Sequence, residues 1–206
     1  MNTLRNIPVN TIIKESLESA ISYQDYRTLV QQLVDENSTT GNDKNEDLVH
    51  YTRLNNKRMR RWDKTITVTE TTKDRVVKFT GDTTWLIITE SWCGDAAHVI
   101  PALSKVAELS SNIDIKLVLR DDNELLMDHY LTNGGRSIAK LIMIDNSTGD
   151  VITTYGPRPV EATKLVDDYK EKHGALTPAF KQDLQVWYNK DKGQSVIQDA
   201  LQLLRV

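Results

Sequence analysis

Cys93, the only cysteine among 206 residues, is the residue of this sequence best placed to do chemistry. It follows a short apolar, β-branched run and precedes a stretch with helical periodicity. A cysteine in the first turn of a helix meets unpaired backbone N–H groups and the positive end of the helix dipole, and both favour the thiolate. We therefore expect a reactive, partly exposed thiol. The alternative for any lone cysteine is a small buried hydrophobe.

Charged residues near Cys93 in the expected fold could tune its pKa. Arg120 closes a predicted strand, and Arg136 precedes another at the same end of the sheet. We hypothesise that one or both lower the Cys93 pKa and attract an anionic thiol such as glutathione, or an acidic peptide. Asp95 would oppose this by repelling the thiolate. The alternative is that Arg120 forms a surface salt bridge with Asp121, Asp122 or Asp95.

Histidine offers little support for metal or general-base chemistry. None of the four histidines lies four residues from another, so we expect no metal site. His98 follows Cys93 by five residues, which places it about 140° around a helix. We therefore expect His98 to be a surface residue and a poor general base.

The elements that must position Cys93 follow from hydrophobic periodicity. The pattern predicts strand, helix, strand, helix and then two strands joined by the turn Asn146-Ser-Thr-Gly149, followed by a helix. The first two strands should be parallel, because a helical crossover links them, and the last two should form an antiparallel hairpin. The strands are expected at 85–89, 113–119, 141–144 and 151–155, and the helices at 93–109, 124–131 and 159–172.

Helices are also predicted on both sides of this segment. Residues 11–35 are interrupted near Ser22, which could cap a second helix, and a polar loop at 37–45 precedes a helix at 46–64. A short helix is expected around 70–79. The pair Thr177-Pro178 opens a further helix, and Gly193 turns the chain into a last one.

Composition and charge narrow the class of protein. A net charge of −3, with 39% hydrophobic and 27% charged residues, is that of an ordinary globular chain with no general attraction to nucleic acid or membrane. The basic stripe Arg53, Lys57, Arg60 and Lys64 is interpreted as a solvated helix face. No apolar run could span a bilayer, the N-terminus lacks a secretory pattern, and one cysteine suits a reducing compartment. We expect a cytoplasmic protein.

The segment Trp92-Cys93-Gly94 after a buried strand, the helix interrupted by Pro101 and the element order together resemble the thioredoxin superfamily, over about Trp85 to Lys172. The chain is most similar to a bacterial branch of thioredoxin family proteins. The segments that carry this likeness are Glu90-Ser-Trp-Cys-Gly-Asp-Ala-Ala97, Val118-Leu-Arg-Asp121 and Gly134-Gly-Arg-Ser-Ile138.

This resemblance implies an α/β, thioredoxin-like fold. A central mixed sheet of about four strands would be flanked by helices, with a helical extension before it and a helical hairpin after it. We place the N-terminal helical extension at 1–80, packed on the core. The thioredoxin-like domain would span 81–174, and the C-terminal helical hairpin 175–206.

The sequence departs from the superfamily at three positions that matter for mechanism. Ala96 replaces the second cysteine, so the intramolecular step that releases product in a thioredoxin is missing. Ile87 replaces a buried acid. Ala139 replaces the cis-proline, and we expect the Ile138–Ala139 bond to be trans, because cis bonds before other residues are costly. The residues expected to contact substrate are Trp92, Gly94, Asp95, Ser137, Ile138 and Ala139.

These features leave two functions open. The first is a monothiol thiol-disulfide oxidoreductase: Cys93 attacks a protein or small-molecule disulfide, and an external thiol such as glutathione resolves the intermediate. Monothiol glutaredoxins work in this way, and cluster binding of their type is a minor variant here. The alternative is a redox-inactive thioredoxin-fold module that binds a partner. A peroxide-reducing enzyme is weaker, because no dedicated motif accompanies Cys93. No resident cofactor is expected.

Overall fold

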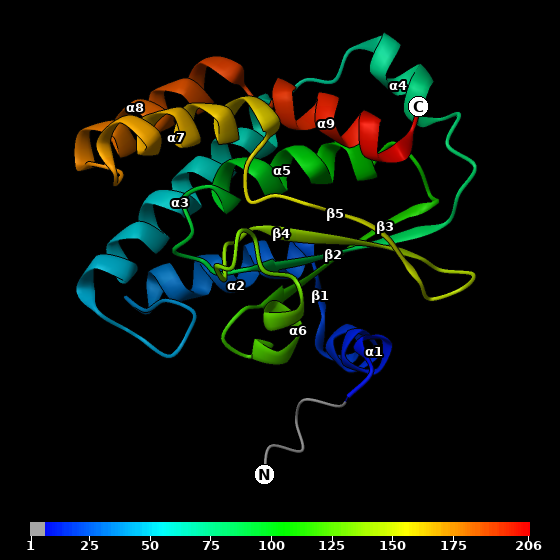
Figure 1. Ribbon diagram of the computed structural model, residues 1–206, viewed down its shortest axis with the longest axis horizontal. Helices are drawn as coiled ribbons and strands as arrows, with labels where there is room; N and C mark the ends of the chain where they lie inside the picture. Colours follow the sequence, from blue (N-terminus) through cyan, green and yellow to red (C-terminus); the bar gives the residue numbers. More distant parts are fainter. Residues whose placement is uncertain (1–6) are drawn as a thin grey trace.

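A five-stranded mixed sheet organises the protein, which a computed structural model describes over residues 7–206 (Figure 1). The strand order is β1-β3-β2-β4-β5. Strands β2 and β3 are parallel, and the other neighbouring pairs are antiparallel. The strands are β1 (Ile21–Ser22), β2 (Thr83–Thr89), β3 (Ile113–Leu119), β4 (Lys140–Asp145) and β5 (Val151–Tyr155). The fold is thus the α/β, thioredoxin-like arrangement that the sequence predicts.

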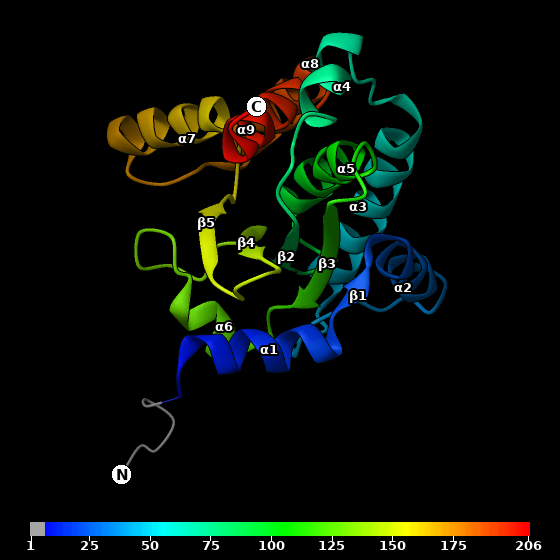
Figure 2. The same cartoon turned by 90° about the vertical axis from the view of Figure 1, so that its right-hand side faces the viewer.

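Helices cover both faces of the sheet, which explains why the central strands are continuously apolar (Figure 2). On one side lie α1 (Val9–Ser19) and α6 (Glu124–His129). On the other side α5 (Ala96–Ala107) packs between α3 (Glu46–Thr65) and α9 (Gln194–Leu204). None of the helices in residues 7–206 is long and apolar enough to cross a membrane.

The remaining helices lie at the edges of these layers. Helix α2 (Tyr23–Asp35) packs on α3 near the β1 edge, and α4 (Glu70–Val76) packs on α9. Helices α7 (Val160–His173) and α8 (Pro178–Asp191) lie side by side (Figure 1).

The predicted helix starts are confirmed by their capping bonds. Ser22 Oγ accepts the backbone N–H of Asp25 at 3.1 Å, and Thr177 Oγ1 accepts that of Phe180 at 3.2 Å.

Strand β1 is an addition to the four expected strands. Its two residues pair with β3 from within the interruption between α1 and α2, and a strand of this length carries no readable periodicity.

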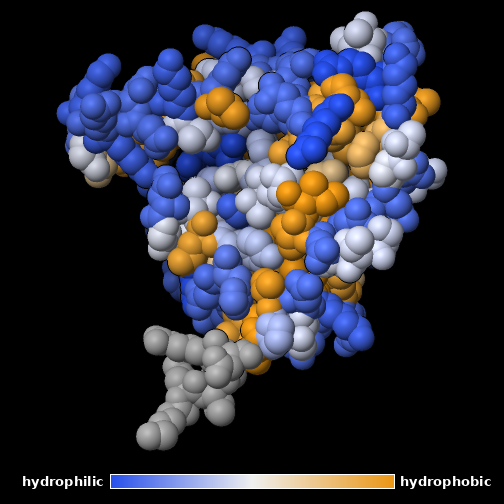
Figure 3. Space-filling model, turned by 45° about the vertical axis from the view of Figure 1, so that its right-hand side comes forward, coloured by the Kyte–Doolittle hydropathy of each residue, from blue (hydrophilic) through white to orange (hydrophobic). Residues whose placement is uncertain are grey.

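Two separate apolar clusters hold the helices. The main core runs from α1 through the sheet and α5 to α9. The second is small and lies between α7 and α8; its buried members are Ala162, Val166, Leu184 and Tyr188. Figure 3 shows apolar side chains in an interrupted band down one face, whereas mostly hydrophilic side chains cover the region of α7. The last helix therefore belongs with the main core, and α7 with α8 forms a lesser unit.

Candidate functional site

Cys93 lies in the turn between β2 and α5, closely covered by other residues. Helix α5 begins at Ala96, so Cys93 precedes the helix rather than occupying its first turn. Its thiol donates a hydrogen bond to the Ile138 carbonyl oxygen at 3.2 Å, and the Ala96 N–H lies 3.5 Å from Sγ. The residue is only 7% exposed. The expectation of a partly exposed thiol is therefore wrong.

The surroundings of Cys93 favour the protonated thiol. Burial, and after it the charge of the neighbouring Asp95 carboxylate, raise the pKa of the Cys93 thiol to about 12. The backbone N–H groups of Ala96 and Asp95, together with Arg158, act in the opposite direction and are outweighed. Backbone N–H groups at the helix start thus lower the Cys93 pKa as expected, but desolvation raises it by more.

Asp95 is held by two residues from distant parts of the chain. Its Oδ2 pairs with Arg158 Nη2 at 2.6 Å, and its Oδ1 accepts a hydrogen bond from the Tyr188 hydroxyl at 2.9 Å. Burial raises the Asp95 pKa, while Arg158 and Tyr188 oppose that shift. Arg158 follows β5 and Tyr188 lies in α8. No local motif marks either residue, and sequence reasoning missed both.

The structure places Arg120 and Arg136 in other interactions. Arg120 pairs with Asp121 at 2.8 Å, the alternative considered from the sequence, and its guanidinium lies over the Trp92 ring at 4.9 Å. Arg136 is 42% exposed and pairs with Asp128 at 2.6 Å and with Glu124. Among the leading influences on the Cys93 pKa, the cation is Arg158. Arg158 therefore has the pKa-lowering role that the sequence suggested for Arg120 or Arg136.

The loop facing Cys93 differs from expectation in its backbone. The Ile138–Ala139 bond is cis, so the prediction of a trans bond is wrong. Contacts on both sides define this arrangement: the Ile138 carbonyl accepts the Cys93 thiol, and the Ala139 carbonyl lies against Gly156, where a Cβ would overlap it. Ile138 and Ala139 are buried beside Cys93, while Ser137 is half-buried at the loop edge.

A buried hydroxyl cluster fixes the turn that carries Trp92 and Cys93. Ser91 Oγ lies 3.1 Å from the Thr39 and Thr40 hydroxyls and 2.8 Å from that of Thr52. Asn55 Nδ2 donates to the Ser91 carbonyl at 2.9 Å. The turn is thereby attached to α3 and to the preceding loop. The threonines of that loop were interpreted only as polar loop residues, although they supply this cluster.

His98 is buried between α3 and α8, and the expectation of a surface position is wrong. It is 3% exposed; Trp62 Nε1 donates to its Nδ1 at 2.8 Å, so Nε2 carries the proton and donates to Gln185 at 2.8 Å. Its ring stacks on that of Tyr188 with centroids 4.2 Å apart. Burial lowers the His98 pKa to about 3. The packing of α8 over α5, which local sequence does not reveal, explains the difference.

A groove of about 410 Å³ opens directly over the cysteine turn. Its floor is the turn 92–95, and its walls come from α3 and from the first half of α8. Its charged side chains are Arg58, Asp95, Arg158 and Lys181. Its other lining residues are Leu48, Tyr51, Trp92, Cys93, Gly94, Leu176, Leu184 and Gln185. The flanking helices thus complete this site.

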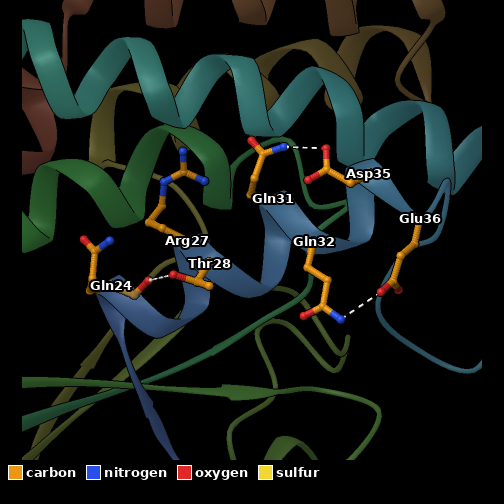
Figure 4. Close-up of a pocket in the computed structure, with 7 residues that line it drawn as sticks. All are labelled: Gln24, Arg27, Thr28, Gln31, Gln32, Asp35 and Glu36. Atoms are coloured by element: carbon orange, nitrogen blue, oxygen red, sulfur yellow. Dashed lines mark hydrogen bonds between the residues drawn. The ribbon is translucent and has the colours of Figure 1, made fainter.

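A second hollow lies along α2, away from Cys93 (Figure 4). Its polar side chains bond largely to one another: Gln31 donates to Asp35 and Gln32 to Glu36, both at 2.8 Å. It contains no cysteine, and its one hydroxyl, on Thr28, donates to the Gln24 carbonyl oxygen at 3.1 Å. Within residues 7–206, no three histidine, cysteine or acidic side chains come together in a way that could hold a metal. The groove over Cys93 is therefore the candidate site.

The strand order, the cysteine turn between β2 and α5 and the 138–139 loop facing it define a thioredoxin-fold protein with a single thiol. The chain belongs to the Thioredoxin family, whose sequence model matches residues 41–170. No curated protein matches the chain.

Two solved structures share the fold at low sequence identity. One is a protein of unknown function from Pseudomonas aeruginosa, 15% identical, with a TM-score of 0.59 over 90% of this chain and 98% of that one. The other is an HIV epitope-scaffold, 14% identical, with a TM-score of 0.58 over 90% and 98% of the two chains. At these identities the likeness concerns the fold alone.

Proposed function

We propose that this protein is a thioredoxin-fold binding module in which the groove over Cys93 holds a ligand and the thiol does not turn over disulfides. The observation that carries the proposal is the position of the Cys93 sulfur. It is buried, and its S–H donates a hydrogen bond to the Ile138 carbonyl oxygen at 3.2 Å. A nucleophilic cysteine must instead be deprotonated and accessible.

Two neighbouring residues support the same conclusion. Ala96 occupies the position from which a second cysteine would attack a mixed disulfide, so no intramolecular release step is available. Asp95 adds negative charge beside the sulfur and raises the pKa of the Cys93 thiol. The groove, by contrast, is formed by several elements and falls within the range of about 300–1,000 Å³ usual for ligand sites.

A monothiol oxidoreductase is the second candidate, because Cys93 itself lines the groove. The Cys93 thiolate would attack one sulfur of a bound disulfide, forming a mixed disulfide and releasing the other sulfur as a thiolate. An external thiol such as glutathione would then attack the mixed disulfide. This step returns Cys93 to the thiolate and leaves the external thiol disulfide-bonded to the substrate.

Reaction with oxidised glutathione at pH 7 separates the two candidates. For a binding module we expect one adduct to form slowly. Intact-protein mass spectrometry monitors the reaction, and Cys93→Ser is the blank. The denatured wild-type chain serves as the reference for an unprotected thiol. Modification of the native protein as fast as that of the denatured chain would contradict the binding module and support the oxidoreductase.

A further inference from the structure

The groove over Cys93 carries an excess of positive charge. Three cationic side chains, Arg58, Arg158 and Lys181, line it together with one carboxylate, Asp95. That carboxylate is already engaged by Arg158 and by the Tyr188 hydroxyl. Among residues 7–206, Arg58 and Lys181 have no ion-pair partner. The excess is notable because the whole chain has a net charge of −3.

Arg58 is the more constrained of these two cations. It is half-buried on α3, where its Nη1 donates to Asn55 Oδ1 at 2.8 Å. The same Nη1 lies 3.8 Å from the point where a Cβ on Gly94 would stand, so the guanidinium leans over the cysteine turn. A guanidinium has five N–H donors, and most of those on Arg58 are left for a ligand. Lys181 faces the groove from α8.

The remaining lining of the groove is largely apolar. Leu48 and Tyr51 come from α3, Leu184 from α8 and Leu176 from the segment before it, and Trp92 lies on the floor. Tyr51 is 45% exposed, so part of its ring is open to a ligand in the groove. A ligand that matches this surface carries anionic groups together with an apolar group.

We propose that the groove between α3 and α8 binds an acidic peptide segment of a partner protein, with carboxylates at Arg58 and Lys181 and an apolar side chain against Leu48, Tyr51 and Leu184. This rests on the proposed binding function and specifies its ligand. Charge complementarity selects an acidic partner, while the apolar lining favours a side chain over a bare phosphate. RNA is the competing class, because guanidinium groups and aromatic rings also bind it.

The test uses the full chain and two labelled pentapeptides, in which leucines are flanked either by glutamates or by glutamines. Fluorescence polarisation at low salt measures their affinities. We expect the glutamate peptide to bind about tenfold more tightly than the glutamine peptide. The double variant Arg58→Gln with Lys181→Gln should lose that preference.

The matched control carries Lys57→Gln with Arg60→Gln, which removes two exposed charges on the opposite face of α3. It should stay within about twofold of wild type, since screened surface charges contribute little. Circular dichroism checks that both double variants fold. An equal loss of affinity in the control would show a general charge effect and overturn the proposal.

The other outcomes separate this inference from the binding function. Equal affinity for both peptides would overturn the acidic preference but leave a binding groove. If neither peptide binds, or if a short single-stranded RNA displaces the glutamate peptide and itself binds more tightly, the acidic-peptide assignment is overturned. Rapid glutathione adduct formation on native Cys93 would overturn the binding function itself, whatever the peptides do.

Discussion

At the scale of single residues, Asp95 adds to the effect that burial has on the neighbouring Cys93 thiol. Its carboxylate lies beside a sulfur that is already desolvated, and negative charge so placed opposes formation of a second negative charge. Arg158 and Tyr188 hold the carboxylate in position. Asp95 therefore disfavours the thiolate form of Cys93. Its ion pair with Arg158 also joins the cysteine turn to the segment after β5.

Asp95→Asn should make Cys93 easier to ionise. The substitution removes the negative charge and keeps the size of the side chain, so the Cys93 pKa falls and the alkylation profile moves to lower pH. We expect a shift of roughly one pH unit. Iodoacetamide labelling between pH 7 and 11, with mass spectrometry as the readout, measures it. Asp122→Asn, at an exposed position, is the control. An unchanged or upward-shifted profile would show that Asp95 has no such effect.

His98 gives the protein a specific sensitivity to acid. Burial lowers its folded-state pKa to about 3, whereas an unfolded histidine titrates near about 6.5. The unfolded chain therefore takes up this proton first as the pH falls. The stability that neutral His98 contributes is fully present above about pH 6.5 and is lost progressively toward pH 3.

Removing that titration should flatten the acid limb of the stability curve. His98→Gln should lose less of its free energy of unfolding between pH 6.5 and pH 4 than wild type, by on the order of a few kcal/mol. Urea unfolding at several pH values gives the slopes, and His50→Gln, at an exposed site, should keep the wild-type slope. Parallel curves for His98→Gln and wild type would contradict this account.

At the scale of elements, the cysteine turn depends on α3 as much as on β2 and α5. Ser91 connects the turn to Thr52 of α3 and to the loop before it, and Asn55 of α3 holds the Ser91 carbonyl. Each of these groups is buried, so each needs a hydrogen-bond partner. A helix outside the usual βα core thus takes part in building the site.

Ser91→Ala should destabilise the protein although it removes a single oxygen atom. The change takes a shared partner from Thr39, Thr40 and Thr52, and losing buried hydrogen bonds of this kind costs roughly 1–3 kcal/mol. Guanidinium unfolding measures the loss. Ser111→Ala, at an exposed position, should change the free energy of unfolding by less than about 0.5 kcal/mol. An equal, small effect of both substitutions would exclude the proposed role of Ser91.

The sequence allowed most of the elements to be predicted, but less of the site. Strand β3 and the starts of α2 and α8 follow from periodicity and capping residues, which are local signals. The partners of Asp95 could not be found in this way. Arg158 and Tyr188 reach it only because the C-terminal helices fold back over α5, and no spacing rule connects residues so far apart along the chain.

The same limit explains the wrong expectations for Cys93 and His98. Cys93 was expected to be exposed because it stands near a helix start at the end of a buried strand, and His98 because it lies about 140° around the helix from Cys93. Their burial comes from α8 and the 138–139 loop, which arrive from elsewhere in the chain. Local patterns predict which element a residue belongs to, but not which distant element will cover it.

At the scale of the whole molecule, the two apolar clusters suggest unequal stability. The main core spans the sheet and most helices, whereas the α7–α8 cluster has four buried members. Regions with little buried apolar surface open at lower free energy than the global unfolding reaction. Helix α8 also covers His98 and lines the groove over Cys93, so opening of this unit would uncover the groove floor.

Hydrogen exchange should therefore distinguish α8 from α5. We expect amides in 178–191 to exchange faster than those in 96–107, and Tyr188→Phe to increase the difference by removing the bond to Asp95. Tyr169→Phe is the matched control, since the Tyr169 hydroxyl bonds to Thr177 at 2.9 Å, within the same unit. Equal protection of the two helices in the wild-type protein would contradict this picture.

The lone cysteine in the groove has a practical consequence for ligand discovery. Because the chain holds one thiol and that thiol lines the groove, an occupant would shield it from small alkylating reagents. Labelling of the buried thiol is already slow, so a further fall in its rate at a fixed alkaline pH, relative to the ligand-free protein, reports groove occupancy. The protein can therefore be screened against unlabelled candidates by mass alone, with its own sulfur as the footprinting probe.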